Sequence, residues 1–316
     1  MNSMQALIDE YIVYKRRLGG DMKSSESLLR QFARFAARTG CETLCKDAAL
    51  NFLDSLKETN KSVYIHASVL REFGKYLALF GHEAYILPPK FAASVAPEPP
   101  YFFSDAEIQR FFASLDAITS SSSYVGRDLV LKAIFRLIYC CGLRCKEART
   151  LQCENVNLHE GYIDIKDSKG PKSRRVFTGP ELTDYMRSYD DSISRLFPSR
   201  KFFFPHEGSC YDDGFLPRNF KRIWIEAFPE FKKGFTRPRA YDFRHHFVWT
   251  NINNWVKDGM DVNVLLPYLM RYMGHAEISS TLYYFRFVPD FYPTFQGISC
   301  KTESLIPEVT YEEAQH

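Results

Sequence analysis

The sequence predicts a mainly α protein with two domains, an N-terminal helical bundle and a mixed, mostly α domain with a small antiparallel β-hairpin. Three observations lead to this fold class. The chain has 316 residues, more than a single hydrophobic core usually contains, so its length favours two domains. Apolar residues recur with helical spacing along most of the chain, and a proline-rich segment divides it. Two short runs in the second part have the character of strands.

The first part of the chain contains four amphipathic segments with short breaks between them. We expect helices over 4–17, 24–38, 45–59 and 61–80. Helices of this kind bury one face each, so they should pack as a small bundle. In the second segment Arg30, Arg34 and Arg38 recur every four residues away from the apolar face, forming a ridge. The ridge is either a solvated surface or a phosphate-binding one.

The segment LPPKFAASVAPEPP, at 87–100, separates the two parts. Prolines lack an amide donor and resist helix formation, so this stretch should be an extended linker. We place the boundary near Ala96, which gives domains 1–96 and 97–316. Just beyond it, Ser104 and Glu107 have the spacing of a capping box, which predicts a helix through Phe112.

The second domain should continue with a long buried helix over 127–141, a turn at Gly142 and a helix over 144–152. Strand-like runs at 161–166 and 174–178 flank a loop with Gly170 and Pro171, which indicates a β-hairpin. The chain after Gly179 is mainly helical, with segments at 242–256 and 262–273 and a short helix from Ser280.

Composition excludes several classes of protein. The net charge of +3 is too small to indicate a nucleic-acid partner by itself. The eight cysteines include no C-x-x-C pair, so we expect reduced thiols and no metal site. The N-terminal residues do not resemble a signal peptide, and the most apolar stretch, 129–143, is too short to span a bilayer. We therefore expect a cytoplasmic protein.

Four segments of the second domain carry side chains suited to catalysis, and the first two supply mainly basic ones. In CGLRCKEARTL, Arg144 precedes Glu147 by three residues, so the carboxylate can hold the guanidinium in one orientation. SKGPKSRRV, in the hairpin loop, carries Lys169 on a segment that can reach into a cleft. Taken alone, the first is an ordinary ion pair and the second a solvated basic turn.

The other two segments lie near the end of the second domain. RAYDFRHHF contains Tyr241, Arg244 and His245, and YMGHAEISSTLYYF contains His275 and Tyr284. Alone, a Tyr-Tyr pair on an amphipathic helix is more often core packing than chemistry.

In this order, the four segments resemble the catalytic boxes of the tyrosine recombinase (phage integrase) family and span most of residues 98–290. The family patterns are G-L-R-x-x-E-x-x-x-L, G-K-G-x-K-x-R, H-x-x-R-H and L-G-H-x-x-x-x-T-x-x-Y. The resemblance implies site-specific cutting and rejoining of DNA, with no metal ion, ATP or other cofactor.

The resemblance implies a role for each matching residue. Tyr284, nine residues after His275, is the nucleophile that attacks a backbone phosphate and forms a 3′-phosphotyrosyl bond. Arg144 and Arg244 would grip the non-bridging oxygens of that phosphate, where negative charge grows in the transition state. Lys169 would deliver a proton to the departing 5′ oxygen.

Tyr241 departs from the family pattern, which usually has histidine at this position. A phenol can donate a hydrogen bond to phosphate, but near neutral pH it is a poorer base than imidazole. The resemblance therefore leaves the base open: His245 or water could substitute, or the enzyme could be defective.

The family also implies an architecture. A SAM-like core-binding domain and the catalytic domain would clamp double-stranded DNA at specific recombination sites, with accessory DNA-bending proteins as further partners. The tail after Tyr284 would pack on a neighbouring protomer, giving a homotetramer on synapsed DNA. The candidate contacts with the DNA backbone come from the ridge and the hairpin: Arg30, Arg34, Arg38, Lys172, Arg174 and Arg175.

Two alternatives share these residues. A type IB topoisomerase would relax supercoils without pairing sites, using the same arginines, lysine and tyrosine. A regulator derived from an integrase would bind DNA without cutting it, because of Tyr241. Relaxation of any plasmid would favour the first alternative, and specific binding without a covalent adduct would favour the second.

Overall fold

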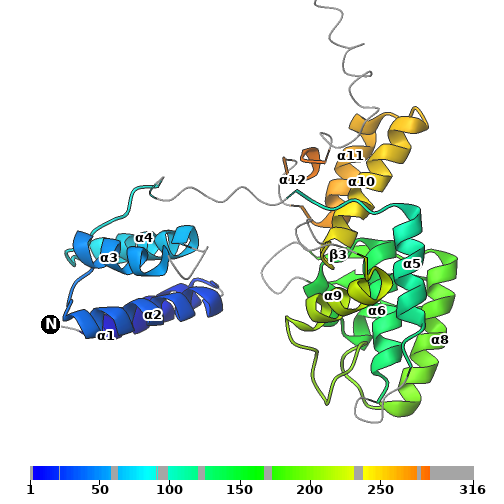
Figure 1. The fold of residues 1–316 in the computed structure, drawn as a ribbon, viewed down its shortest axis with the longest axis horizontal. Helices are drawn as coiled ribbons and strands as arrows, with labels where there is room; N and C mark the ends of the chain where they lie inside the picture. Colours follow the sequence, from blue (N-terminus) through cyan, green and yellow to red (C-terminus); the bar gives the residue numbers. More distant parts are fainter. Residues whose placement is uncertain are drawn as a thin grey trace, which may run out of the picture. The chain divides into compact units, whose positions relative to one another are not determined.

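The computed structural model describes residues 3–20, 22–57, 63–89, 91, 99–119, 125–166, 173–230, 238–275 and 279–284. The chain divides into two compact units, Met1–Glu98 and Pro99–His316, close to the boundary expected at Ala96. Figure 1 shows helices throughout the described part of the first unit, and mostly helices in the second. The mainly α fold class is confirmed.

The described part of the first unit is a bundle of α1 (Met4–Arg17), α2 (Lys23–Thr39), α3 (Lys46–Lys57) and α4 (Val63–Leu79). Helix α2 packs against each of the other three. Its apolar residues Leu29, Phe32 and Ala36 lie at helical spacing and are fully buried, which is why this segment forms a helix with one inward face. The ends agree with the expected ones to within two residues, except that the expected end of α3 at 59 and the expected start of α4 at 61 lie outside the described residues.

The second unit is built around α6 (Arg127–Cys141), which contacts α5 (Asp105–Asp116), α8 (Pro180–Leu196) and α10 (Asp242–Lys257). Its apolar residues are buried around much of its circumference, as expected for a central helix. The expected capping box at Ser104 and Glu107 is present at the start of α5. The helix then runs to Asp116 rather than ending at Phe112, because Phe111 and Leu115 continue its buried face.

The helix expected over 144–152 is shorter, α7 (Cys145–Arg149). The chain leaves the helix there because Leu151 and Cys153 form backbone hydrogen bonds with Phe203 and Lys201 instead. The η1 turn (Cys153–Asn155) follows, and then β1 (Val156–Asn157), a strand too short to show in the sequence pattern. The antiparallel sheet has the order β1, β2 (Tyr162–Ile165), β3 (Arg174–Phe177), so the expected hairpin is confirmed and gains an edge strand.

The remaining helices are α9 (Phe215–Ala227), α11 (Val262–Met273) and α12 (Ser279–Leu282). The main core of the unit is rich in aromatic rings, which accounts for much of the aromatic content of the sequence. A second, smaller core forms where α10, α11 and α12 meet, from the buried side chains of Val248, Ile252, Leu269, Met273 and Tyr284.

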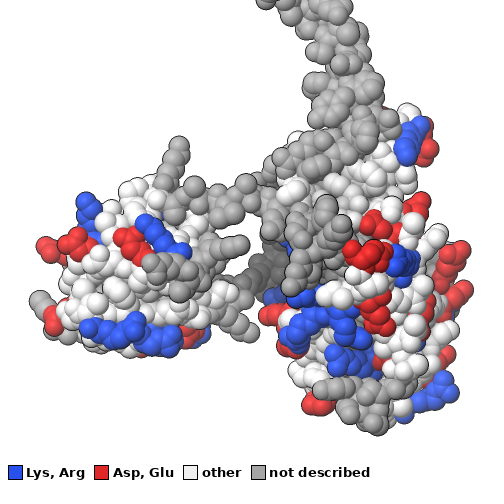
Figure 2. Space-filling view, viewed as in Figure 1, with Lys and Arg blue, Asp and Glu red and all other residues white. Residues whose placement is uncertain are grey.

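The surface of the described residues carries clustered basic side chains. Figure 2 shows a band of Lys and Arg along the edge of the first unit formed by α1 and α2, and a second group on the other unit. Within the described ranges, no helix is both long enough and apolar enough to cross a membrane.

Candidate active site

The first feature of the site is a carboxylate that organises Arg144. Helix α6 ends at Gly142, whose positive φ of 61° turns the chain so that Arg144 becomes the residue preceding α7. Glu147, one turn later, accepts a hydrogen bond from the Arg144 guanidinium through Oε1 (2.7 Å) and from the Arg144 backbone amide through Oε2 (2.8 Å). The short helix therefore fixes the first catalytic arginine predicted from the sequence.

Arg174 reaches the same carboxylate from β3. Its Nη1 and Nη2 atoms donate to Glu147 at 3.0 and 2.8 Å, and its Nε donates to the Tyr272 carbonyl at 2.6 Å. The side chain is 7% exposed. The sequence led us to expect Arg174 at the DNA backbone, and the structure corrects this: its donors are engaged inside the site, where it holds Glu147.

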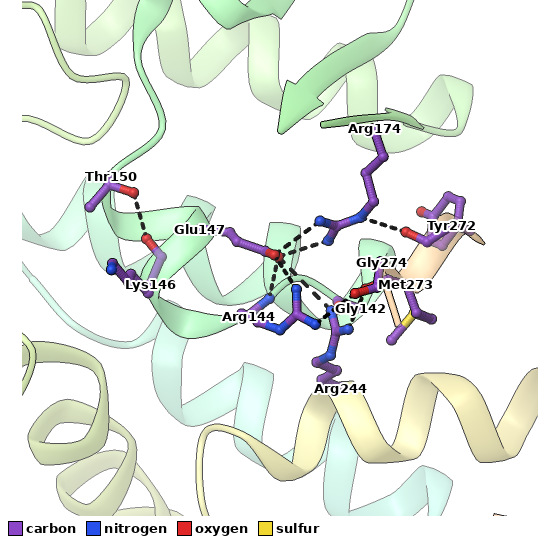
Figure 3. A network of polar contacts seen from close by, with 10 residues as sticks. All are labelled: Gly142, Arg144, Lys146, Glu147, Thr150, Arg174, Arg244, Tyr272, Met273 and Gly274. Atoms are coloured by element: carbon purple, nitrogen blue, oxygen red, sulfur yellow. Dashed lines mark hydrogen bonds and ion pairs between the residues drawn. The ribbon is translucent and has the colours of Figure 1, made fainter. Parts of the chain in front are cut away.

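Arg244 completes the cluster from α10 and is 1% exposed. It donates to the carbonyls of Gly142 (2.8 Å) and Met273 (2.5 Å), and its Nη1 lies 3.9 Å from Glu147 Oε2. Figure 3 shows the three guanidinium groups converging on the Glu147 carboxylate. Each also donates to backbone carbonyls: Arg144 to Gly274, Arg174 to Tyr272, and Arg244 to Gly142 and Met273. Burial, and then the charge of Arg144, lower the pKa of Arg244 to about 10, which still leaves it charged at neutral pH.

One carboxylate cannot neutralise three guanidinium groups, so the cluster has an excess of positive charge. Burial alone would raise the pKa of Glu147, but the hydrogen bond and charge of Arg174, the hydrogen bond from the Arg144 amide and the charge of Arg244 together lower that pKa to about 2. Arg144 is the most exposed of the three arginines, at 37% against 7% and 1%. It borders a cavity of about 680 Å³ that is also lined by Lys146, Lys166, Glu154 and Asp164. Glu154 pairs with Lys166 and Asp164 with Arg175, so the excess positive charge of the arginine cluster faces the cavity, as an anion site requires.

His275 follows α11 and lies beside the arginines. Its Nδ1 forms a hydrogen bond with Thr281 Oγ1 (2.8 Å), which ties α12 to the site. Burial, and then the charges of Arg244, Arg144 and Arg174, lower the pKa of His275 to about 4. The imidazole is therefore neutral at neutral pH.

Tyr284 lies two residues after the end of α12 and is 4% exposed within the small α10–α12 core. Its hydroxyl lies 2.5 Å from Nδ1 of His245, and burial raises its pKa above the usual value. Tyr241, at the start of α10, is exposed and packs edge-on against the His245 ring, with 4.9 Å between ring centroids. The structure therefore gathers residues from all four sequence segments, with Arg174 coming from the second, and the hydroxyl of Tyr284 is the one hydrogen-bonded to His245.

Comparison with known proteins identifies the chain at family level. Residues 103–288 match the phage integrase family, more than half of the chain. The chain belongs to this family.

Its relatives support the same assignment. A putative integrase/recombinase, y4rE of Sinorhizobium fredii, is 30% identical over 88% of this chain and 89% of its own. The tyrosine recombinase XerA of Thermococcus kodakarensis is 24% identical over 75% and 76% of the two chains. The protein is therefore a tyrosine-type site-specific recombinase, an enzyme that cuts and rejoins DNA. The topoisomerase and regulator alternatives are not favoured.

Solved structures share the fold. The XerH recombinase bound to its difH substrate superposes with a TM-score of 0.63 at 18% identity, covering 90% of this chain and 82% of its own. A lambda integrase dimer bound to a core site gives 0.62 at 13% identity, covering 88% and 97%.

The other residues predicted for this recombinase are not among those that the structure gathers around Glu147 and Tyr284. Lys169 and Lys172 lie outside the described residues. Arg175 is exposed on the outer face of β3, where it pairs with Asp164 and lies over the Tyr162 ring. The inward position of Arg174 could have been found in the sequence, because it shares strand parity with the buried Val176.

On the first unit, the arginine ridge has two different parts. Arg30 forms ion pairs with Glu26 and Asp9. Arg34 and Arg38 are exposed and border a hollow of about 600 Å³. In the described part of the chain, no cluster of three or more His, Cys, Asp or Glu side chains could hold a metal ion.

Proposed function

We propose that this recombinase cleaves DNA by attack of Tyr284 on a backbone phosphate, which forms a 3′-phosphotyrosyl bond and frees a 5′ hydroxyl. Attack of a partner strand's 5′ hydroxyl on that bond then rejoins the DNA and releases the tyrosine. The covalent bond conserves the energy of the phosphodiester, so no ATP is needed. The observation that carries the proposal is the convergence of Arg144, Arg244 and His275 near the Tyr284 segment.

In this mechanism, the positive cluster binds the scissile phosphate. Arg144 offers the more exposed fork of the two catalytic arginines, while Arg244 contributes a charge that is held rigid by two carbonyls. Groups fixed in advance of the reaction need no reorganisation as charge grows on the phosphate oxygens, and one such donor is worth about 10²–10³ in rate. Neutral His275 can donate a hydrogen bond to the same phosphate. Lys169 is proposed to protonate the departing 5′ oxygen, and no metal ion or other cofactor is proposed.

The DNA contacts outside the active site are proposed from charge and exposure. Arg34 and Arg38 are the ridge residues best suited to phosphate, since carboxylates compensate the charge of Arg30. Arg175 and Lys172 would add contacts at the hairpin. Contacts of this type fix the register on DNA and weaken with salt, while sequence is read by groove contacts that we do not assign.

The assembly is proposed from the family resemblance. Four protomers would bind two specific sites on double-stranded DNA, with the residues after Tyr284 packing on a neighbouring protomer and accessory DNA-bending proteins assisting. Deletion of residues 289–316 should then impair synapsis more than binding to a single site. We further propose that the recombinase acts in the cytoplasm for a mobile genetic element.

The experiment that tests this function uses a duplex with a nick near the crossover, after its sequence has been selected from random DNA by binding. The wild-type protein and Tyr283→Phe should form a covalent protein–DNA adduct, and Tyr284→Phe should not. An adduct that persists in Tyr284→Phe, or specific binding with no adduct in any protein, would contradict the proposal.

A further inference from the structure

The active site contains an imidazole beside the position where this chain departs from the family pattern. The family pattern has histidine where this chain has Tyr241, so the usual imidazole is missing there. Tyr241 is the residue that precedes α10, with helical backbone angles, and His245 lies four residues later; their rings are in edge-on contact, with 4.9 Å between centroids. Residues with this spacing share one face of a helix. An imidazole is therefore present on the same face, one turn further along.

This imidazole is in direct contact with the reacting oxygen. The Tyr284 hydroxyl lies 2.5 Å from His245 Nδ1, within the distance over which a general base takes a proton. Among the described side chains, His245 is the one hydrogen-bonded to that hydroxyl. The Nδ1 atom of His275 is instead engaged by Thr281.

The protonation states of the two groups follow from their burial. Burial raises the pKa of Tyr284, so the phenol keeps its proton. Burial lowers the pKa of His245 to about 4, and the charges of Arg239 and Arg244 act in the same direction against the opposing Asp242. His245 is thus neutral. In the tautomer with its proton on Nε2, its Nδ1 accepts the hydrogen bond that the phenol donates, and this is the tautomer that proton transfer requires.

We propose that His245 is the general base that accepts the phenolic proton of Tyr284 during strand cleavage. The inference rests on the proposed function, because it takes Tyr284 as the nucleophile. As the phenolic O–H bond breaks, its proton moves to His245 Nδ1 and the oxygen forms a bond to phosphorus. The P–O5′ bond breaks with its electron pair on O5′, which takes a proton from a separate donor, proposed above as Lys169. In rejoining, His245 returns the proton to the tyrosine.

The proton stays on the phenol until a phosphate is bound, because the raised pKa of Tyr284 and the lowered pKa of His245 both oppose its transfer. Transfer is therefore coupled to attack on a bound phosphate, and no free tyrosinate forms beforehand.

The test compares His245→Asn with His246→Asn in the full-length protein. Asparagine keeps a hydrogen-bonding atom near the Nδ1 position but cannot take up a proton. The neighbouring His246 is a matched control, because its Nδ1 accepts a hydrogen bond from the Phe103 amide and it has no contact with Tyr284 in the described structure. Adduct formation is measured on the nicked duplex and on the same duplex with a 5′-bridging sulfur, whose thiolate leaves without a proton.

His245→Asn should form the adduct about 10²–10⁴-fold more slowly on both substrates, while its affinity for the duplex stays close to wild type. His246→Asn should remain near the wild-type rate. Lys169→Ala, a variant of the proposed acid, should be slow on the ordinary duplex and recover on the sulfur substrate. His245→Gln replaces His245→Asn if the latter fails to fold.

Three results would overturn the inference: a wild-type rate in His245→Asn, a faster rate, or recovery of that variant on the sulfur substrate. A faster rate would indicate that the hydrogen bond between His245 and Tyr284 restrains the tyrosine. Recovery on the sulfur substrate would indicate that His245 is the acid that protonates the departing 5′ oxygen. Failure of the proposed function is distinguishable, since the wild-type protein would then form no adduct with either duplex.

Discussion

Two neighbouring residues of α10 enter very different surroundings. Phe243 is fully buried among aromatic rings, including those of Phe103, Phe111 and Phe220. Arg244 is 1% exposed, yet it enters a network of charges and carbonyls around Glu147. The aromatic core can be filled by shape alone, whereas every buried charge needs partners to offset its loss of hydration. The two residues show that the aromatic core stabilises the fold, while the buried network around Glu147 holds charged groups in fixed positions.

The largest effect on stability is expected from Phe243→Ala. It leaves a cavity in the aromatic core and should lower the free energy of unfolding by about 3–5 kcal/mol. The folded fraction should still form the covalent adduct, because no group that contacts the phosphate is removed. Urea unfolding and adduct rates corrected for the folded fraction check this. A loss of adduct rate as large as that of an arginine variant would contradict the purely structural role assigned to Phe243.

Arg244→Met should reduce the adduct rate more than the stability. Its adduct rate should fall about 10²–10³-fold, which is about 3–4 kcal/mol of transition-state stabilisation. The free energy of unfolding should change less than in Phe243→Ala, because Glu147 retains Arg144 and Arg174 as partners. The same two measurements apply. A collapse in stability with a normal rate in the folded fraction would show that Arg244 is structural.

Arg174 and Arg175, adjacent in β3, allow a buried and an exposed ion pair to be compared within one strand. Arg174→Ala removes a buried partner of Glu147 and should lower the free energy of unfolding by about 3 kcal/mol. Arg175→Ala removes an exposed ion pair with Asp164 and should unfold at nearly the wild-type urea concentration. Equal midpoints for the two variants would contradict the assigned difference between the inner and outer faces of β3.

The smallest expected effect is on the pH dependence of stability. The pKa of His275 is about 4 in the folded protein, against an ordinary value of 6.5. Between these values the unfolded chain binds more protons, so the free energy of unfolding should fall as the pH falls from 6.5 to 4. His275→Asn should make this fall shallower, although His245 contributes in the same direction. Urea midpoints at several pH values measure the slope, and an unchanged slope would contradict the burial of His275.

Much of this organisation could be predicted from the sequence, since it depends on local patterns. The helical segments follow from apolar spacing, and the α5 capping box follows from Ser104 and Glu107. Motif order identified Arg144, Arg244, His275 and Tyr284, which the fold brings into one region.

Other features depend on contacts between distant segments. The early end of α7 is caused by pairing with residues 201–203, which no local pattern reports. The contact of Arg174 with Glu147 could not be predicted, because it depends on β3 lying beside α7 in the fold. The contact between His245 and Tyr284 likewise joins residues 39 positions apart. Strand β1 is only two residues long, so it has no periodicity to detect.

The most direct test of the account is to find the atom that carries the DNA. The covalent adduct formed by wild-type protein on the nicked duplex would be digested with protease and nuclease and mapped by mass spectrometry. The account predicts that the 3′-phosphonucleotide is attached to Tyr284. Attachment to Tyr283, to Tyr241 or to any other residue would contradict it.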